Sequence, residues 1–278
     1  MIRLMKLSRI LWLAPCFYSL VVHADMTSVI QEAQKAAVAK NRKVATNKLL
    51  NAIKSEHTPK NKAKLMETLK SLSDVFFTDQ GQRLFETAQS MAYESSDTAL
   101  ARFNEALAME DSNVVILLAM ARVQLSKKDC ASAETTLQTA GEINPYDKTL
   151  RFLRAKSLLC QHKATDALAL LKMDPVDEPV ANVTMASALY ETGNEHEAMG
   201  LLQKTASRDA SYPESHYWLW KVAEDKTDAA EDQGQKYIAL CKNLNLRTRR
   251  KYINEPCLCG QTQEVEDAIK AAQKNADR

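Results

Sequence analysis

Glycine, proline and aromatic residues are scarce in this sequence. Its 278 residues include six glycines and seven prolines, and only 6% are aromatic. Sheet proteins depend on turn glycines and on runs of β-branched or aromatic residues, so these low counts argue against a β-rich fold. Alanine, leucine, lysine, glutamine and glutamate are abundant instead, and all of them favour helices. The composition therefore predicts an all-α protein, and its 45% apolar content is enough for a sizeable core.

The motifs of common catalytic and metal sites are also absent. The sequence has no glycine-rich phosphate loop, no Gly-x-Ser-x-Gly nucleophile motif and no His-Glu-x-x-His zinc motif. Four histidines beyond the leader lack partners at metal-ligand spacing, so we expect them at the surface: His57, His162, His196 and His216. We therefore predict that the protein is not an enzyme and needs no cofactor or metal.

The first 24 residues have the layout of a cleaved secretory signal peptide. A basic start is followed by the apolar run 10–22, and the small residue Ala24 stands just before Asp25. A membrane-spanning helix is the alternative, but it needs about 20 apolar residues and Pro15 interrupts this run. We expect cleavage and export to the periplasm. Secretion, or a lipid anchor at Cys16 in a weak lipobox, are the alternatives.

Removal of this leader leaves a chain that is nearly neutral. Arg3, Lys6 and Arg9 are three of the 37 basic residues, and the leader contains none of the 35 acidic ones. The mature chain then has 34 basic and 35 acidic residues, so the formal charge of +2 belongs to the leader. A balanced charge does not indicate a basic surface that would bind nucleic acid. We therefore expect that nucleic acid is not a partner.

A regular spacing of alanines divides the middle of the sequence into four units. The lead alanines, Ala99, Ala133, Ala167 and Ala198, are 34, 34 and 31 residues apart. Each is preceded by an alanine eleven or twelve residues earlier, and each is followed by Leu or Phe four residues later. Polar turns such as "SKKD" lie between the two alanines of a unit. The pattern predicts helical hairpins in which small residues let the two backbones approach where they cross.

This pattern resembles the tetratricopeptide repeat family over residues 80–210. The Ala-x-x-x-Leu/Phe core and the period near 34 carry the resemblance, although no unit has the family's first-helix Trp. The unit led by Ala167 is three residues short within "KMDPVDEP", so we expect its second helix to end early, at Asp174. The resemblance implies an α-solenoid whose first helices line a concave groove that binds a peptide or domain of another protein.

By the same resemblance, ten side chains of the first helices should face this groove: Phe85, Gln89, Tyr93, Leu118, Arg122, Phe152, Lys156, Val183, Ser187 and Tyr190. Arg122 and Lys156 form a central positive pair, which favours a partner segment with acidic and apolar side chains. The alternative for Phe85, Leu118 and Phe152 is that they pack between units.

The flanking segments are predicted to be helical but less regular. The domain boundaries that we expect are a signal peptide at 1–24, N-terminal helices at 25–79, four repeats at 80–210, a degenerate fifth hairpin at 211–245, and a cysteine-containing loop with a capping helix at 246–278. Ser28 and Gln31 form a capping box that opens one long helix reaching Ile53, and Thr58-Pro59 starts another. Thr262 opens the last helix.

An aromatic stretch, "HYWLW", lies in the fifth hairpin. It contains His216, Tyr217, Trp218 and Trp220, and it can serve either as an anchor for a partner or as core packing. Side chains on consecutive faces cannot all point inward, so at least one of Tyr217, Trp218 and Trp220 should be partly exposed.

Five cysteines remain after the leader: Cys130, Cys160, Cys241, Cys257 and Cys259. Cys130 opens one predicted helix and Cys160 closes a neighbouring antiparallel one, so we expect a disulfide between them. Cys241 should pair with Cys257 or Cys259, which leaves one cysteine over. The alternative function is a thiol-redox or soft-metal protein that uses the Cys257-x-Cys259 pair. The basic run from Arg247 to Lys251 is either a solvated surface or a site for an anionic polymer.

Overall fold

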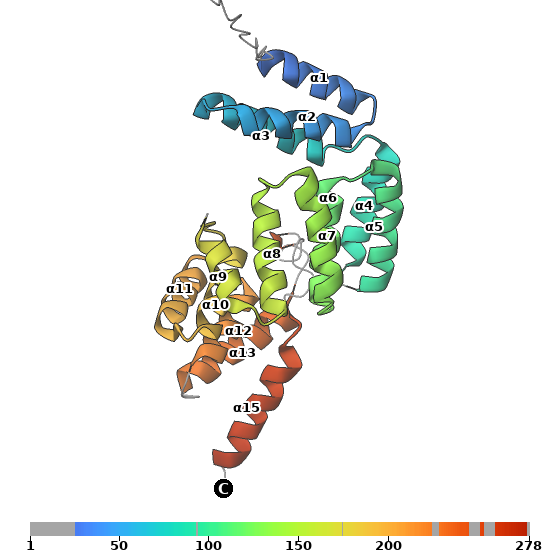
Figure 1. Ribbon diagram of the computed structural model, residues 1–278. Helices are drawn as coiled ribbons and strands as arrows, with labels where there is room; N and C mark the ends of the chain where they lie inside the picture. The colour runs from blue at the N-terminus through green and yellow to red at the C-terminus, as the bar shows by residue number, and fades with distance from the viewer. Residues whose placement is uncertain are drawn as a thin grey trace, which may run out of the picture.

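A computed structural model describes residues 26–92, 94–173, 175–223, 228–244, 251–252 and 259–276. Within these ranges the chain forms fourteen α-helices and no strand (Figure 1). The helices are α1 (Met26–Val38), α2 (Arg42–Ser55), α3 (Pro59–Asp74), α4 (Asp79–Met91), α5 (Ser96–Glu110), α6 (Val114–Ser126), α7 (Cys130–Ile143), α8 (Lys148–Cys160), α9 (Ala164–Lys172), α10 (Pro179–Glu191), α11 (Glu195–Arg208), α12 (Pro213–Val222), α13 (Asp228–Lys242) and α15 (Thr262–Ala276). None of these helices is long and apolar enough to cross a membrane.

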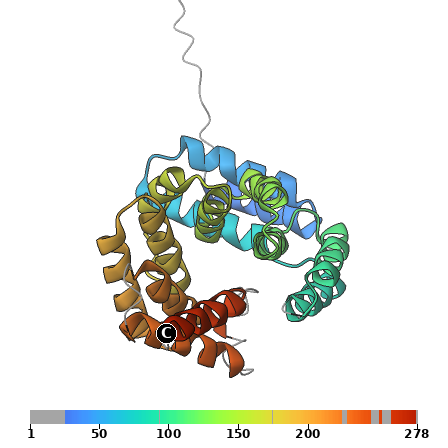
Figure 2. The ribbon, with the colours of Figure 1, turned by 90° about the horizontal axis from the view of Figure 1, so that it is seen from below.

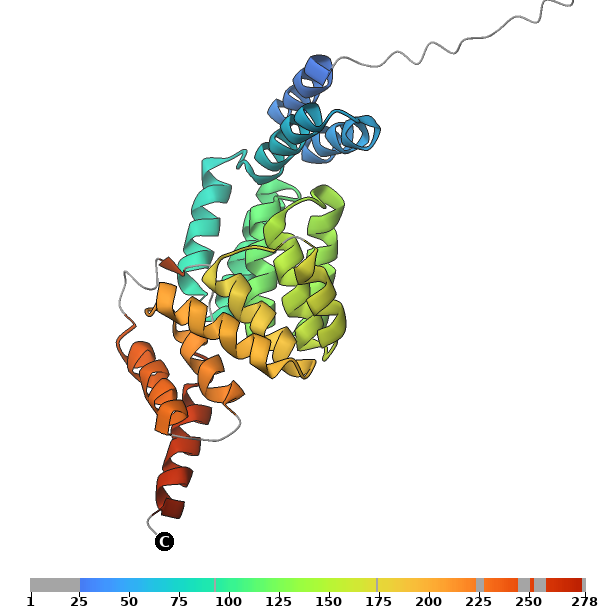
Figure 3. The ribbon, with the colours of Figure 1, turned by 90° about the vertical axis from the view of Figure 1, so that its left-hand side faces the viewer.

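The helices from α4 to α13 pair into five antiparallel hairpins that stack one on the next. The first helices α6, α8, α10 and α12 contact each other in turn. Seen along the stack, the hairpins follow an arc that opens between the α4–α5 hairpin and α15 (Figure 2). The bundle of α1, α2 and α3 covers one end of the stack, and α15 extends from the other (Figure 3). The predicted all-α solenoid of helical hairpins is confirmed.

The alanines that define the repeat lie at the helix crossings. All eight are fully buried, at 0% exposure: Ala88, Ala99, Ala121, Ala133, Ala155, Ala167, Ala186 and Ala198. The large residues four positions after the lead alanines are also buried, with Phe103, Leu137 and Leu202 at 0–1% exposure. A methyl group is the largest side chain that this close approach of two backbones accommodates, which explains the strict spacing.

Three successive hairpins reverse direction through the same backbone cap. Lys128, His162 and Gly193 stand at corresponding places in the turns and all have left-handed φ angles, of 60°, 60° and 80°. In each turn the next residue donates its N–H back to the preceding helix, as Asp129 does to the carbonyl of Gln124 at 2.9 Å. These bonds are the 6→1 bonds of the Schellman motif, in which glycine is the usual left-handed residue. Two of the three turns therefore hold a side chain where glycine is preferred.

We expect Lys128→Gly and His162→Gly each to raise the free energy of unfolding by up to about 1 kcal/mol, because glycine adopts the left-handed conformation without a Cβ penalty. Gly193→Ala should lower it by a similar amount. Urea denaturation followed by helical circular dichroism measures both effects. Lys127→Gly is the matched control, because Lys127 has a right-handed φ of −79° and glycine there should give no gain. A stabilisation by Lys127→Gly as large as that by Lys128→Gly would contradict the explanation.

The single long helix expected before Thr58 is wrong. The chain forms α1 and α2 instead, separated by Lys40 with a left-handed φ of 59° and by Asn41, which caps α2 by accepting from the Val44 N–H at 3.2 Å. Ser28 lies inside the first turns of α1 and does not begin the helix. The break allows α2 to fold back on α1, so that Ala33, Leu49 and Leu69 share one core. The predicted start of α3 after Thr58 is observed.

A buried arginine joins this N-terminal bundle to the first hairpin. Arg42, the first residue of α2, is 0% exposed and lies with its guanidinium 4.2 Å from the centre of the Phe77 ring. It donates hydrogen bonds of 2.8–3.2 Å to backbone carbonyls at the end of α3, just after α3 and at the end of α5, those of Leu72, Ser73, Val75, Glu110 and Asp111. The guanidinium therefore organises the loop where the two parts of the chain meet.

The carboxylate of Glu110 completes this cluster. It is fully buried, 3.4 Å from the Arg42 guanidinium, and it accepts from the Phe77 N–H at 2.6 Å and the Thr78 N–H at 2.8 Å. Gly81 packs against it so tightly that an added Cβ would lie 2.5 Å from a carboxylate oxygen. Buried charges are tolerated when they are paired and hydrogen-bonded, and both conditions are met here.

The third hairpin is shortened, as the sequence predicts. Its second helix, α9, has nine residues and ends at Lys172, while Asp174, where we expected the end, lies outside the described residues. Pro175 follows shortly after, and Pro179 begins α10. Proline removes a helix hydrogen bond and restricts the residue before it, so the chain here cannot continue as a helix.

Candidate functional site

The inner side of the arc contains a pocket of about 320 Å³ that is built by the first helices of four hairpins and by Gln261, which directly precedes α15. Four of the predicted groove residues line it: Arg122 from α6, Lys156 from α8, and Val183 and Ser187 from α10. Tyr217 and Trp218 from α12 also line it, so the predicted groove and the aromatic stretch meet at one site.

The charges of the pocket are divided between its two ends. Arg122, Lys128 and Lys156 come from the second and third hairpins, while Glu191 and Glu214 come from the fourth and fifth. Partial burial raises the pKa of Glu191, and the neighbouring His162 and Lys221 act in the opposite direction. An extended segment lying along the arc would therefore meet basic groups first and acidic groups later.

The other predicted groove residues are not in this pocket. Phe85 is buried and packs between the tilted rings of Phe76 and Phe103, with ring centres 5.3 and 5.8 Å away. Leu118 is also buried, in the core shared by α6, α7 and α8, so packing between units is the observed role of both. Phe152 is half-buried between two such cores.

The three remaining residues that we predicted for the groove are Gln89, Tyr93 and Tyr190. Gln89 is half-buried on α4, and Tyr93 lies outside the described residues. Tyr190 is partly exposed and meets the edge of Trp218, with ring centres 6.2 Å apart. These two rings extend the inner surface of the arc beside the pocket.

The aromatic stretch is mainly core. Tyr217 and Trp220 are 4% exposed and pack against Tyr237 and Val265, so α12 binds both α13 and α15. Trp218 alone among Tyr217, Trp218 and Trp220 is partly exposed. It is therefore the residue of this stretch that is available to a partner.

The expectation that His216 lies at the surface is wrong. Its ring is 6% exposed, with Nδ1 2.7 Å from Oε1 of Gln233 and Nε2 3.1 Å from the carbonyl of Ala210. Both ring nitrogens have hydrogen-bond partners, which is why this histidine can be buried. His57, His162 and His196 are exposed, as expected.

A hydrogen-bonded triad that the sequence did not indicate borders the pocket. Lys221 donates to the hydroxyl of Tyr217 at 2.8 Å, and this hydroxyl donates to Glu264 of α15 at 3.2 Å. Burial raises the pKa of Tyr217. The triad fixes α15 against the last hairpin. Glu191 was also missed, although it lies one helical turn after Ser187, so extending the predicted face by one turn would have included it.

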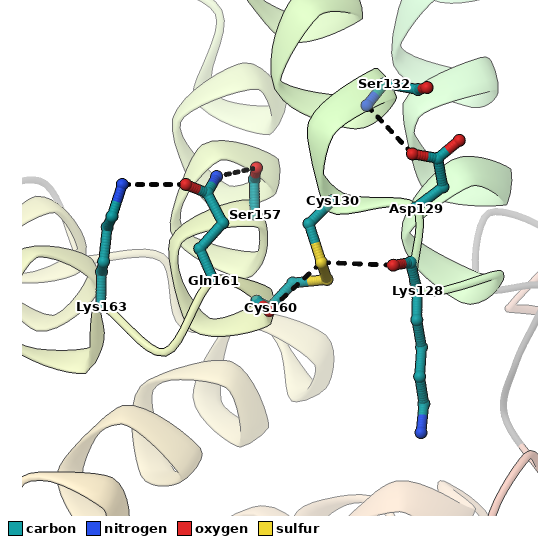
Figure 4. Close-up of a disulfide and its surroundings, with 8 residues drawn as sticks. All are labelled: Lys128, Asp129, Cys130, Ser132, Ser157, Cys160, Gln161 and Lys163. Atoms are coloured by element: carbon teal, nitrogen blue, oxygen red, sulfur yellow. Dashed lines mark hydrogen bonds between the residues drawn. A yellow bond between two sulfur atoms is a disulfide. The ribbon is translucent and has the colours of Figure 1, made fainter.

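Four cysteines form two disulfides. Cys130 and Cys160 join the start of α7 to the end of α8, with 5.8 Å between their Cα atoms, and this is the expected pair (Figure 4). Asp129 caps α7 beside it by accepting from the Ser132 N–H at 3.1 Å. Cys241 pairs with Cys259, with 5.6 Å between Cα atoms.

This second disulfide bears on the alternative function. A redox or metal site at Cys257 and Cys259 needs a free Cys259 thiol, whereas Cys259 is bonded to Cys241. Over the described part of the chain, no group of three or more His, Cys, Asp or Glu side chains is placed to hold a metal. Cys257, Cys16, the whole leader and the basic residues Arg247, Arg249 and Arg250 lie outside the described residues.

Comparisons with known proteins give one profile match and several similar solved structures. Residues 91–157 match the sequence profile of a tetratricopeptide repeat family. Among solved structures, MamA from Desulfovibrio magneticus is 16% identical with a TM-score of 0.43, over 60% of this chain and 98% of that chain. A tetratricopeptide repeat protein from Parabacteroides merdae is 13% identical with a TM-score of 0.48, over 83% and 98%. No curated protein sequence matches the chain. The profile match includes the α6–α7 hairpin, and hairpins of the same alanine spacing lie on both sides of it, so this part of the chain is similar to tetratricopeptide repeats.

Proposed function

We propose that this protein is a non-catalytic scaffold that binds a segment of another protein in the pocket on the inner side of its arc. Tetratricopeptide repeat proteins in general bind other proteins, which supports the broad class. The observation that carries the specific proposal is the meeting of Arg122 and Lys156, from two neighbouring hairpins, in one pocket with Trp218.

The chemistry of the pocket indicates what kind of segment it binds. A carboxylate bound by Arg122 and Lys156 gains charge-assisted hydrogen bonds, which are stronger than neutral ones. An apolar side chain next to it can pack on Trp218, and tryptophan commonly dominates binding energy at interfaces. The partner segment is therefore acidic at one end and apolar towards the other.

The proposed location is the cell envelope. The leader at 1–24 supports export, and disulfides such as Cys130–Cys160 persist in oxidising compartments. Export to the periplasm is favoured over secretion or a lipid anchor at Cys16.

Reversal of both positive charges, in Arg122→Glu/Lys156→Glu, should weaken capture of the partner by about tenfold or more, because each lost charged hydrogen bond costs about 1.5–3 kcal/mol. The measurement is quantitative crosslinking and recovery of bound protein from the native envelope fraction. The melting temperature should stay within about 2 °C, since both side chains are partly exposed where they line the pocket.

A matched variant separates local from general charge effects. Lys43→Glu/Lys62→Glu changes two exposed lysines on α2 and α3, far along the chain from the pocket, and should leave capture unchanged. Equal capture by the wild type and by a folded Arg122→Glu/Lys156→Glu protein would place the binding site elsewhere, with the exposed face of Trp218 next to be tested.

A further inference from the structure

The short helix α9 leaves a second groove in the stack. The other second helices, α5, α7, α11 and α13, have 14 or 15 residues, so α9 with nine is five or six residues shorter. At 1.5 Å per residue, about 8 Å of helix is missing. A groove of about 750 Å³ lies beyond the end of α9, bounded by the first turns of α8, by α10 and by α11.

The floor of this groove is apolar. Phe152, Leu171, Met185 and Leu201 line it, so Phe152 faces this groove rather than the pocket inside the arc. Met173, which directly follows the last residue of α9 and stands outside the groove lining, is 77% exposed. Methionine adapts its shape to different apolar partners and is frequent at binding surfaces. The apolar surface that a full-length α9 would cover is thus open to another segment.

The rim of the groove is mainly basic. Four basic side chains line it, Lys148, Arg151, Lys172 and Lys204, against two acidic ones, Asp177 and Glu197. Asp177 is bound by Arg208, with 2.6 Å to each of its oxygens, and by Asn182 at 3.0 Å. Its charge is therefore compensated within the protein. Since the mature chain as a whole is nearly neutral, this local excess of positive charge favours a negatively charged occupant.

We infer that the groove beyond α9 is a docking site for a short amphipathic helix with acidic flanks, supplied by a partner protein. The apolar stripe of that helix takes the place of the missing turns of α9 against Phe152, Met185 and Leu201. Its acidic side chains meet Lys148 and Lys204 on opposite sides of the groove. This is the helix-in-groove mode of recognition, with anchors three and four residues apart.

Gly200 provides a direct way to close the groove. It lies on α11 in the groove wall, and a Cβ added to it meets no atom within 4 Å. Gly200→Phe should therefore fill the groove without a clash, while Gly200→Ala leaves it open. Both variants replace a glycine in a helix interior, so both should fold at least as well as the wild type.

The experiment is a selection from displayed random peptides of about 16 residues on the disulfide-intact protein, with depletion on Gly200→Phe. We expect the enriched peptides to contain more Asp and Glu than Lys and Arg, with apolar residues at helical spacing. A synthetic copy of the best peptide should bind the wild type and Gly200→Ala with Kd values within about twofold. Gly200→Phe and Lys148→Glu/Lys204→Glu should each weaken its binding by about tenfold or more, or 1.4 kcal/mol.

Other outcomes overturn the inference. No enrichment after depletion, or enrichment of basic or non-helical peptides, is incompatible with an acidic helix. Binding of a fatty acid such as laurate that is lost in Gly200→Phe, without peptide enrichment, would identify a small-amphiphile pocket instead. Self-association of the wild type that Gly200→Phe abolishes in sedimentation would identify a second copy as the occupant. Weaker binding of the peptide to Arg122→Glu/Lys156→Glu would place it inside the arc, where the proposed function is tested separately.

Discussion

Arg42→Met is expected to lower the free energy of unfolding by about 3–5 kcal/mol, because removing one partner of a buried ion pair leaves the other charge uncompensated. Methionine retains the apolar stem but donates no hydrogen bond. Five backbone carbonyls would lose the hydrogen bond from the guanidinium, although that of Val75 would still accept from the Asn113 amide. The Glu110 carboxylate, 0% exposed, would lose its counter-charge. Urea denaturation monitored by circular dichroism gives the difference.

Two variants identify the cause of this loss. Lys43→Met changes the next residue of α2, which is exposed, and should alter the free energy of unfolding by less than about 0.5 kcal/mol. Glu110→Gln keeps the shape of the carboxylate but directs an amide N–H₂ toward the N–H of Phe77 or Thr78, so it should also destabilise strongly. A loss below about 1 kcal/mol in Arg42→Met would mean that the cluster forms without the guanidinium.

Removal of the disulfide between α7 and α8, in Cys130→Ser/Cys160→Ser, should lower the free energy of unfolding by about 3–4 kcal/mol. The bond closes a loop with a sequence separation of 30 residues, and opening it increases the conformational entropy of the unfolded chain. Denaturation in the absence of reductant is the measurement. With a reductant present, the wild type and the variant should unfold at similar urea concentrations. Equal stability without reductant would show that the bond contributes nothing.

The alanine spacing made most of the fold predictable. A small residue at each crossing is required by the contact of two backbones. The period of these small residues is therefore visible in the sequence, even when the helices that contact each other are not known. Ala133 and Ala167 illustrate this, since both are fully buried in the first turn of the second helix of their hairpins. The early end of α9 was predictable for a similar reason, because proline acts on its own segment.

Features that depend on distant partners were not predictable. Lys40 breaks the first helix within a run of helix-forming residues, where no glycine marks the left-handed position of the turn, and α2 then packs back on α1. In the sequence, Arg42 stands among other basic residues in "KNRK" and resembles an ordinary surface charge. Its hydrogen-bond partners lie 30 to 69 residues away in the chain, so the local sequence does not indicate that it is buried. His216 is buried through the carbonyl of Ala210 and the amide of Gln233, and only the second of these is on another helix.

The pocket inside the arc was predicted in part. Arg122, Lys156, Val183 and Ser187 follow from the face of each first helix that points away from the alanine crossing, and all four line the pocket. Phe152 was assigned to the same face but lines the groove beyond α9. Its position depends on how far α9 extends beside α8, which is a relation between helices and not a property of one helix.

The disulfide between Cys130 and Cys160 also determines how the arc responds to force. In a stack of hairpins, each hairpin contacts only its neighbours, so a change in the curvature of the arc is divided among the interfaces between successive hairpins. Each such interface is called a joint. A covalent bond across the joint between the second and third hairpins makes that joint stiff, and it lies directly beside Arg122 and Lys156. When the two ends of the arc are pulled apart, the extension is therefore taken up by the other joints. The spacing of the two positive charges stays constant while the rest of the surface changes its curvature.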